Sequence, residues 1–312
     1  MSSSPVRVAV VGVGHLGQHH ARLLAAMPQV MLAAVVDTKP GRAAEIGGRY
    51  GAAPFTDARD VMGVVDAVTI AVPTASHVEV AGLFVARGIP VLVEKPLAAS
   101  LVEADRLLDE AGRGGVMVAT GHTERFNPAV EAALPLVSAP RFIEIHRLGT
   151  FPERSLDIDV IFDLMIHDID LLLASVRSEV ESIEAVGVNV LTPRTDIANA
   201  RLRFASGCIA NLTASRISRE RVRKARFFQP ESYISIDYAS QEVEVYRLAA
   251  GNGRPVIEGG RLQVEQEEPL HRELADFIRA VRTGGEPTVT GRAGREALAL
   301  ASRIADEMRL TT

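Results

Sequence analysis

Two short segments of this sequence contain the residue types of a nucleotide-dependent enzyme. The first, Gly-Val-Gly-His-Leu-Gly at residues 12–17, follows the apolar run at residues 8–11. The second, Glu94-Lys95-Pro96, follows the apolar run at residues 91–93. Glycine turns of this kind cradle a diphosphate, and an ammonium group at the end of a strand can stabilise a developing alkoxide. The two segments together predict a cofactor and a catalytic cation in one crevice.

The glycines have separate expected roles in this turn. Gly12 permits a tight turn, Gly14 lets a diphosphate approach the backbone, and Gly17 lets the following helix pack close to the strand. The N-terminus of that helix offers N–H groups to phosphates. Asp37 follows 20 residues after Gly17, where a carboxylate can accept hydrogen bonds from ribose hydroxyls. The alternative is a structural turn and a solvated aspartate.

The charges near Asp37 bear on which nicotinamide cofactor the chain takes. The Asp37 carboxylate favours NAD because it would repel the 2′-phosphate of NADP. Lys39 and Arg42 point the other way, since either side chain could reach a phosphate. We expect NAD, with NADP as the alternative.

A third group of titratable residues lies on a predicted helix over residues 163–173. At about 100° per residue, Asp163, His167 and Asp170 fall within ~60° of one another, and apolar residues surround them. Such a helix should be buried, so these groups need partners or a cleft. A histidine beside a carboxylate suits a general base. A purely structural histidine is one alternative, and a metal site is another, although no other residues supply a clear ligand pattern.

The Lys95-Pro96 dipeptide has two features that affect where the lysine side chain points. Lys95 is expected at the carboxyl end of a strand, where open α/β sheets bind ligands. Pro96 restricts the residues before it and is a candidate for a cis peptide bond. The alternative for Lys95 is an ordinary surface lysine after a strand.

Composition describes an ordinary globular chain of two domains. It has 312 residues, of which 47% are hydrophobic and 23% charged, and a net charge of −5. That charge gives no general attraction for nucleic acid or anionic membranes. The single cysteine, Cys208, excludes an internal disulfide and is expected to be a core thiol. The N-terminus does not resemble a signal peptide and no apolar stretch approaches a membrane span, so we expect a cytoplasmic protein.

The pattern of apolar residues changes near residue 122. Before it, strand-like runs alternate with helix-like stretches, which predicts a parallel sheet covered on both faces. After it, residues 198–204 and 208–212 alternate apolar and polar positions around the Ser206-Gly207 turn, which predicts an antiparallel hairpin with one face exposed. We therefore expect an α/β Rossmann domain over residues 1–122 and, over residues 123–312, an α+β domain with an open-faced, mostly antiparallel sheet.

The ordered set of motifs resembles the Gfo/Idh/MocA oxidoreductase family. It comprises the glycine turn followed by His20-Ala21, Val72-Pro73 with His77, Glu94-Lys95-Pro96, Asn127-Pro128, and the helix with Asp163 and His167. The resemblance covers nearly the whole chain. It implies an NAD(P)-linked enzyme that oxidises or reduces a hydroxyl of a sugar or cyclitol. It also implies a homodimer or homotetramer formed through the open sheet.

The resemblance implies roles for individual residues. Lys95 is the catalytic lysine, His167 the acid/base histidine and Asp163 an active-site aspartate. The expected cofactor-binding residues are Gly12, Gly14, His15, Leu16, Gly17, Asp37, Pro73, Thr74, His77, Glu94 and Lys95. The expected substrate-binding residues are Lys95, Arg125, Asn127, Arg147, Asp163, His167 and Arg216.

Two further features concern the substrate. Many family members have a glycine-rich stretch before the aspartate, whereas residues 157–162 here read Asp-Ile-Asp-Val-Ile-Phe. With Arg147-Leu148-Gly149 and the Ile-His-Asp-Ile-Asp core at residues 166–170, this is similar to members that oxidise UDP-N-acetylglucosamine at the 3-position for diamino-sugar or lipid A biosynthesis. Residues 216–226 also contain six positively charged side chains and a single acidic one, Glu220. They could bind a diphosphate, with Arg216 best placed, or form a solvated or inter-subunit loop.

We expect an NAD-dependent dehydrogenase of a sugar hydroxyl, with a UDP-amino sugar as the favoured substrate. One alternative is a dehydrogenase or reductase of a free sugar or inositol. Another is a non-catalytic NAD-binding sensor, but binding alone does not require the pair of Lys95 and His167.

Overall fold

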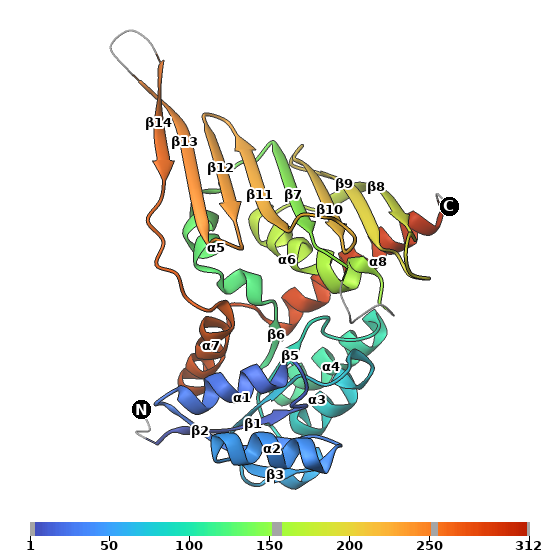
Figure 1. The fold of residues 1–312 in the computed structure, drawn as a ribbon, viewed down its shortest axis with the longest axis vertical. Helices are drawn as coiled ribbons and strands as arrows, with labels where there is room; N and C mark the ends of the chain where they lie inside the picture. Colours follow the sequence, from blue (N-terminus) through green and yellow to red (C-terminus); the bar gives the residue numbers. More distant parts are fainter. Residues whose placement is uncertain (1–3, 152–157, 251–254, 311–312) are drawn as a thin grey trace. The chain divides into compact units, whose positions relative to one another are not determined.

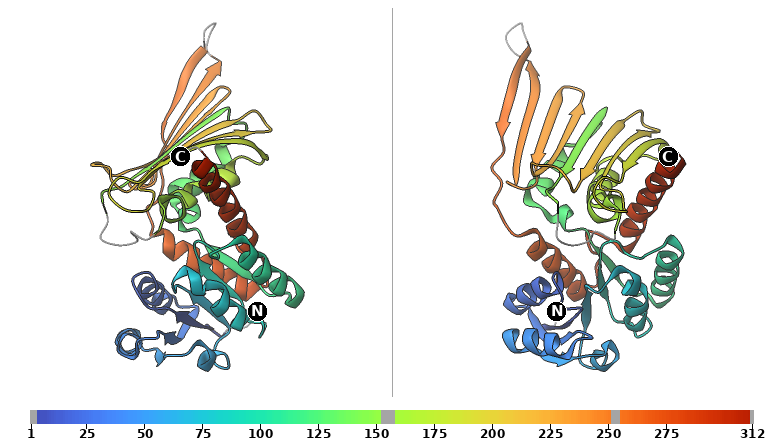
Figure 2. Two further views of the ribbon diagram at one scale, coloured as in Figure 1. Left: turned by 90° about the vertical axis from the view of Figure 1, so that its right-hand side faces the viewer. Right: turned by 45° about the vertical axis from the view of Figure 1, so that its right-hand side comes forward.

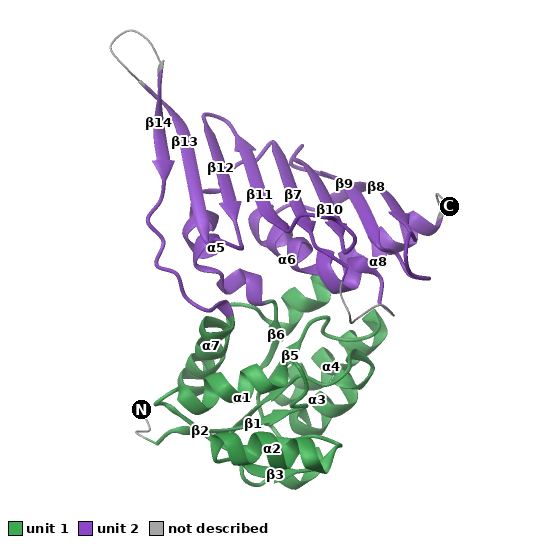
Figure 3. Ribbon diagram, viewed as in Figure 1, with its two compact units in different colours: residues 1–122, 270–298 green, residues 123–269, 299–312 purple. Residues whose placement is uncertain are grey.

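The computed structural model describes residues 4–151, 158–250 and 255–310. Asp157, one of the residues on which the substrate resemblance rests, lies outside these ranges. The chain forms two compact units (Figure 3): residues 1–122 with 270–298, and residues 123–269 with 299–312. Residues 270–298, which we had assigned to the second domain, therefore belong to the first unit. The reason is that their apolar helix face packs in the core of that unit.

The first unit contains a six-stranded parallel sheet in the order β3-β2-β1-β4-β5-β6. The order reverses between β1 and β4, and this is where open α/β sheets bind ligands. The central strands are almost wholly buried, as their continuous apolar runs predict. The strands are β1 (Val6–Val11), β2 (Val30–Val36), β3 (Ala53–Phe55), β4 (Ala67–Ile70), β5 (Val91–Glu94) and β6 (Val118–Gly121).

Helices cover this sheet (Figure 1), and α4 shows how a helix of this unit begins and ends. In α4, the Ser100 side chain accepts the first-turn N–H of Glu103, and Gly115 ends the helix at φ 62°. The helices and short helical turns are α1 (Gly17–Ala26), α2 (Pro40–Tyr50), η1 (Ala58–Val61), η2 (Thr74–Ser76), α3 (His77–Val85), α4 (Leu101–Gly114), α7 (Pro269–Thr283) and α8 (Gly291–Leu310).

The α7 helix completes the core of the first unit. Leu274, Phe277 and Ile278 belong to the same buried cluster as Val8 of β1 and Leu24 of α1. The spacing of these three residues places them on one face of α7. The cluster explains why the segment belongs with β1 and β2 although it lies so far along the chain.

The second unit is built on an eight-stranded sheet in the order β14-β13-β12-β11-β7-β10-β9-β8. All neighbouring pairs in this order are antiparallel except β7 with β10, so the expected mostly antiparallel sheet is confirmed. Its strands are β7 (Phe142–Leu148), β8 (Val180–Val188), β9 (Ile197–Phe204), β10 (Ile209–Ser215), β11 (Val222–Gln229), β12 (Ser232–Asp237), β13 (Glu242–Ala250) and β14 (Pro255–Arg261).

One face of this sheet is covered by helices and the other is open, as Figure 2 shows. In β9 the side chains of Ala198, Ala200 and Leu202 are buried, while the intervening residues are exposed. The predicted hairpin of β9 and β10 is thus confirmed. The covering elements are η3 (Thr123–Phe126), α5 (Pro128–Ala133), η4 (Leu134–Leu136), the π-helical segment η5 (Ile161–Met165), α6 (Ile166–Ser175) and residues 299–310 of α8.

A row of aromatic rings crosses the open face of the sheet. Phe142, Phe228, Tyr233 and Tyr246, on four neighbouring strands, have successive ring centroids 5.6, 5.1 and 6.4 Å apart. Cross-strand aromatic pairs of this kind stabilise a sheet. No helix within the described residues has the length and apolar character of a membrane span.

Candidate active site

The glycine turn joins β1 to α1 in the geometry that a dinucleotide requires. Gly12 has φ +83°, and a Cβ there would lie 2.6 Å from the carbonyl oxygen of Ala71. A Cβ on Gly17 would collide with the Gly12 carbonyl, so the turn and the helix can approach only with glycine at both positions. Gly14 is exposed with nothing within 4 Å of a built Cβ, and His15 and Leu16 are exposed beside it. The turn therefore fits a diphosphate at its open backbone.

Asp37 lies directly after β2 and contacts the same turn. Its carboxylate accepts the N–H of Val13 at 3.2 Å and the N–H of Lys39 at 3.0 Å. Each oxygen keeps a further lone pair, so the carboxylate can still accept a ribose hydroxyl. The position fits the adenosine side of a dinucleotide.

Arg42 is held by the glycine turn and by its own helix. Its guanidinium donates to the Val13 carbonyl at 2.8 Å, to the Gln18 side chain at 2.9 Å and to Glu45 at 2.8 Å. The arginine that we considered as a ligand for a 2′-phosphate thus supports the turn instead. Lys39 is exposed.

The Glu94-Lys95-Pro96 segment rests on a buried ion pair. Glu94, at the end of β5, is buried, and its Oε1 lies 3.0 Å from Nε2 of the buried His20 of α1. The other oxygen accepts the backbone N–H of Lys95 at 3.2 Å. Burial favours a higher pKa for Glu94, but the hydrogen bond and charge of His20 dominate and lower it. Glu94 is therefore a carboxylate that fixes the backbone of Lys95.

His77 fixes the other side of the same segment. Its ring nitrogens lie 2.9 Å from the carbonyl oxygens of Pro96 and Val72. Burial lowers the pKa of His77, and these two contacts oppose that effect. The Lys95–Pro96 bond is cis, which confirms the expectation for this proline. Pro73 and Thr74 begin the short η2 turn before His77, with Pro73 exposed and Thr74 half-buried.

In the second unit, Asp163 and His167 lie on consecutive helical elements. Asp163 lies in the π-helical segment η5 and His167 is the second residue of α6; both are half-buried. π-helical turns are rare and often occur at functional sites. The third member of the predicted stripe of Asp163, His167 and Asp170 has an ion-pair partner, as a buried carboxylate requires. Asp170 is buried, with Oδ1 3.5 Å from the Arg125 guanidinium.

A buried charge network holds α6 against the sheet. Arg147 of β7 donates two hydrogen bonds to Asp168, at 2.9 and 2.8 Å, and a third to Glu124 at 3.0 Å. Burial raises the pKa of Asp168, and the charge of Arg147 opposes the rise. The Tyr238 ring lies 5.6 Å from the Arg147 guanidinium carbon, and burial raises the pKa of this tyrosine well above its usual value.

The network corrects the expectation that Arg147 contacts substrate. Only 4% of the residue is exposed and its guanidinium donates to the internal carboxylates of Asp168 and Glu124, so it positions the helix that carries His167. Asn127 is similarly internal. Its Oδ1 accepts the N–H of Ala129 at the start of α5, and its Nδ2 donates to the Tyr238 carbonyl at 3.0 Å.

Arg216 is also an internal residue, which corrects its expected contact with a diphosphate. It is 2% exposed and donates to the carbonyls of Ile158 and Thr195, while Nε lies 3.4 Å from Asp196. Asp196 in turn accepts the N–H groups of residues 190–192 at 2.6–2.9 Å. This cluster fixes the loop between β8 and β9.

The basic segment at residues 216–226 does not form one patch, because strand β11 sends alternate residues to opposite faces. Lys224 and Arg226 lie on the open face, where they pair with Asp237 at 3.3 Å and Glu144 at 2.7 Å. Arg223 lies on the helix-covered face, directly across from Arg147, and is exposed. The charge of Arg223 interacts with all three members of the charge network, Arg147, Glu124 and Asp168.

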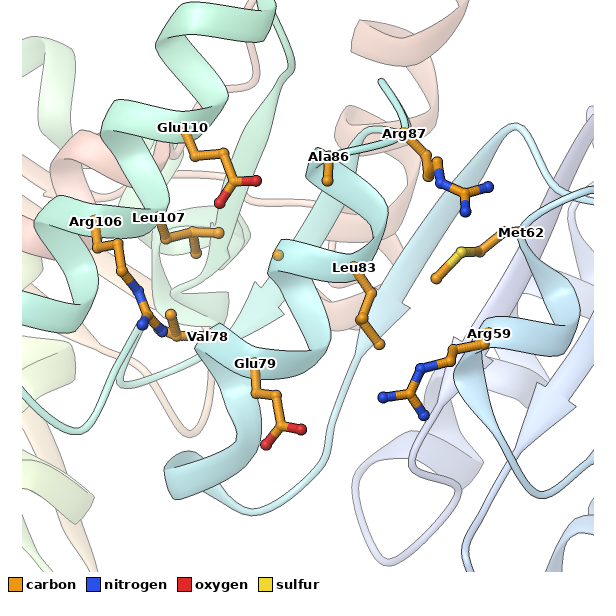
Figure 4. Close-up of a pocket in the computed structure, with 11 residues that line it drawn as sticks. Arg59, Met62, Val78, Glu79, Leu83, Ala86, Arg87, Arg106, Leu107 and Glu110 are labelled. Carbon is orange, nitrogen blue, oxygen red and sulfur yellow. The ribbon is translucent and has the colours of Figure 1, made fainter.

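A separate hollow in the first unit involves none of the expected site residues. It is a 570 Å³ cavity beside α3 and α4, into which Glu79, Leu83, Arg106 and Glu110 project (Figure 4). Its wall does not include the glycine turn or Lys95. Among the residues that the structure describes, no group of His, Cys, Asp and Glu side chains has the arrangement of a metal site.

Sequence reasoning missed the supporting residues His20, Glu124 and Asp168 as parts of the site. The sequence did contain one indication that Asp168 supports the site. Arg147 follows Ile143 and Ile145 at period two, so it occupies a core position of a strand. A buried arginine requires a buried carboxylate, and the apolar helix offered Asp168 as one candidate.

Comparisons with known proteins agree with the motifs. Residues 6–122 match the model of an oxidoreductase family with an NAD-binding Rossmann fold, and residues 103–233 match the GFO/IDH/MocA C-terminal domain. The chain is 37% identical to the UDP-N-acetylglucosamine 3-dehydrogenase of Acidithiobacillus ferrooxidans over 302 residues, 96% of each protein. It is 28% identical to the scyllo-inositol 2-dehydrogenase (NAD(+)) of Bacillus subtilis over 305 residues, 91% of this chain and 89% of the other.

Solved structures show the same fold. A structure of the Acidithiobacillus ferrooxidans enzyme has a TM-score of 0.91 at 36% identity, covering 98% of both chains. Levoglucosan dehydrogenase in complex with NADH has a TM-score of 0.87 at 19% identity, again over 98% of both chains, which shows a shared fold. With a Rossmann domain, the Lys95 segment and the Asp163–His167 helix in place, the chain belongs to the Gfo/Idh/MocA family of oxidoreductases.

Proposed function

We propose that this enzyme uses NAD to oxidise the 3-hydroxyl of UDP-N-acetylglucosamine or a related UDP-amino sugar. The observation that carries the proposal is the 37% identity to UDP-N-acetylglucosamine 3-dehydrogenase over 96% of both chains, compared with 28% for the inositol enzyme. The product would be a 3-keto sugar nucleotide, a precursor for amination in diamino-sugar or lipid A biosynthesis. Its substrate and cofactor would place the enzyme in the cytoplasm.

In the proposed reaction two side chains act on the substrate and a third supports one of them. His167 takes the proton of the reacting hydroxyl, and Lys95 stabilises the alkoxide with its ammonium group. Asp163, close to His167 in sequence, maintains the orientation and charge of the imidazole. NAD, when bound at the glycine turn, accepts the hydride. The buried Glu94 and Arg147 support the two segments that carry Lys95 and His167.

The substrate diphosphate needs a cation, and we propose Arg223 in place of Arg216. Arg223 is exposed, lies on the helix-covered face and is paired with Arg147 of the neighbouring strand β7. Partial burial of the guanidinium and, after it, the positive charge of Arg147 lower the pKa of Arg223. An anion beside this guanidinium would offset the repulsion from Arg147.

We also propose a homodimer or homotetramer formed through the open face of the second sheet. Support comes from the aromatic row at Phe142, Phe228, Tyr233 and Tyr246, part of which is exposed on that face. A second copy would cover it. Sedimentation of the wild type and of Phe228→Glu tests this point, and a monomeric wild type would contradict it.

The test of function is NADH formation from UDP-N-acetylglucosamine, free N-acetylglucosamine, myo-inositol and scyllo-inositol at equal concentrations. We expect the sugar nucleotide to give kcat/KM at least about 100-fold above the free sugar, because charge-assisted contacts to the diphosphate are lost with the latter. Equal rates for an inositol would favour the alternative of a cyclitol dehydrogenase. Tight NAD binding without turnover of any of the four compounds would favour a sensor.

A further inference from the structure

The second unit contains a cavity of 880 Å³ that is separate from Asp163 and His167. It lies beside the end of α6, the η4 turn and the segment that leads into β7. Its walls are residues 134–135, 137–141 and 174–178, with Arg125, Ser206 and Pro230. The α6 helix carries His167 at its beginning and lines the cavity at its end, about 12 Å further along. The volume is that of a site for a small molecule.

The charged groups of the wall are all positive. Arg125, Arg141 and Arg177 line the cavity, and none of its described lining residues is an aspartate or a glutamate. Arg125 is balanced by Asp170, at 3.5 Å. Arg141 and Arg177 are exposed and have no hydrogen bond or ion pair through their side chains within the described residues. Two guanidinium groups therefore face the cavity without an anion.

Hydroxyl groups add further polar contacts on the same wall. Ser138, Ser175, Ser178 and Ser206 all line the cavity. The Ser178 hydroxyl accepts the N–H of Ser206 at 2.9 Å, which leaves its own proton to donate. Proline, valine, leucine and alanine make up the rest of the wall. Guanidinium and hydroxyl donors surrounded by apolar carbon suit an organic anion, and phosphate oxygens match the guanidinium fork best.

We propose that this cavity binds a small phosphate-bearing organic anion, held by Arg141 and Arg177. The sources that share this chemistry are free phosphate and a phosphate ester, and the apolar part of the wall favours the ester. The site is distinct from the glycine turn, which belongs to the first unit. The proposal does not depend on the identity of the oxidised substrate.

The test is calorimetric titration of the full-length enzyme with inorganic phosphate and with phenyl phosphate, at constant ionic strength. Saturating NAD is present so that the cofactor site is filled. We expect saturable binding that weakens about tenfold or more in the Arg141→Ala/Arg177→Ala variant, since each lost contact is charge-assisted. Tighter binding of phenyl phosphate than of phosphate would identify an ester as the ligand class; equal binding would identify phosphate itself.

The matched control is Arg87→Ala/Arg106→Ala, which removes two exposed arginines from the cavity wall of the first unit. This variant should bind both probes as the wild type does. Arg141→Lys/Arg177→Lys should retain part of the affinity. The proposal is overturned if neither probe saturates the wild type, if binding survives unchanged in the Arg141/Arg177 alanine variant, or if the control weakens it equally.

Discussion

His20 Nε2 lies 3.0 Å from Glu94 Oε1, and the other oxygen of Glu94 holds the backbone N–H of Lys95. A side chain of the first helix thereby supports the segment that carries the expected catalytic lysine. Because His20 and Glu94 are both buried, water cannot replace either side chain as the hydrogen-bond partner of the other.

Replacement of His20 by Ala should impair both stability and turnover. We expect a loss of about 1–3 kcal/mol in the free energy of unfolding, because a buried carboxylate is left without its partner. The value of kcat should fall while the Kd of NAD changes little. His20→Gln, which keeps a donor, should recover part of kcat. Denaturant titration and steady-state kinetics measure these effects, and a His20→Ala enzyme with unchanged kcat would exclude a positioning role.

Lys95→Ala and His167→Ala should each lower kcat by at least about 100-fold. The affinity for NAD should be largely kept, because the glycine turn and Asp37 are unchanged. Stopped-flow measurement of NADH formation, with NAD binding followed by fluorescence, separates the two effects. Turnover like that of the wild type in either variant would remove that residue from the mechanism.

NAD should bind at least tenfold more tightly than NADP, because the Asp37 carboxylate repels the 2′-phosphate of NADP. Arg42 does not offset this repulsion, since its guanidinium is hydrogen-bonded to the glycine turn. Asp37→Asn should reduce this preference. Calorimetric titration with both cofactors gives the ratio directly. Equal affinities in the wild type would assign the dominant charge to Lys39, and Lys39→Ala would then restore the preference for NAD.

Arg216→Ala and Arg223→Ala should have different effects although the two residues belong to one basic segment. Loss of Arg216 should reduce stability by about 3–5 kcal/mol, since it breaks a buried ion pair. Loss of Arg223 should leave stability nearly unchanged and raise the KM for the sugar nucleotide about tenfold or more. If Arg216→Ala were as stable as the wild type and only its KM rose, the original expectation for Arg216 would be restored.

Acid should destabilise the β8–β9 loop by protonating Asp196. Burial would raise its pKa, but three backbone N–H groups and the Thr192 hydroxyl outweigh that effect and lower it to about 2. A lowered pKa contributes stability that is present above the unfolded value of about 4 and is lost as the pH falls toward 2. The wild type should thus lose more stability than Asp196→Asn between about pH 4 and pH 2. Parallel pH–stability curves for the two proteins would contradict this.

The sequence predicted most elements that local patterns specify. The alternation of strands and helices before residue 122, the β9–β10 hairpin and the glycine turn follow from period and glycine position. The three-residue strand β3 was not predicted. The π-helical segment at Asp163 could not be predicted, because a single extra residue in a helical turn leaves no mark on an apolar pattern. The links from Glu124 and Asp168 to Arg147 join distant parts of the chain, so only the tertiary structure reveals them.

The position of α7 has a consequence for synthesis of the protein. Leu274, Phe277 and Ile278 complete the apolar cluster of β1 and α1, yet they leave the ribosome about 150 residues after the sixth strand. At a translation rate of about 5–20 residues per second, part of the apolar surface of the nascent Rossmann sheet stays uncovered for roughly 8–30 s. A fragment that stops at residue 122 would keep that surface exposed, so it should aggregate rather than behave as an independent cofactor-binding module.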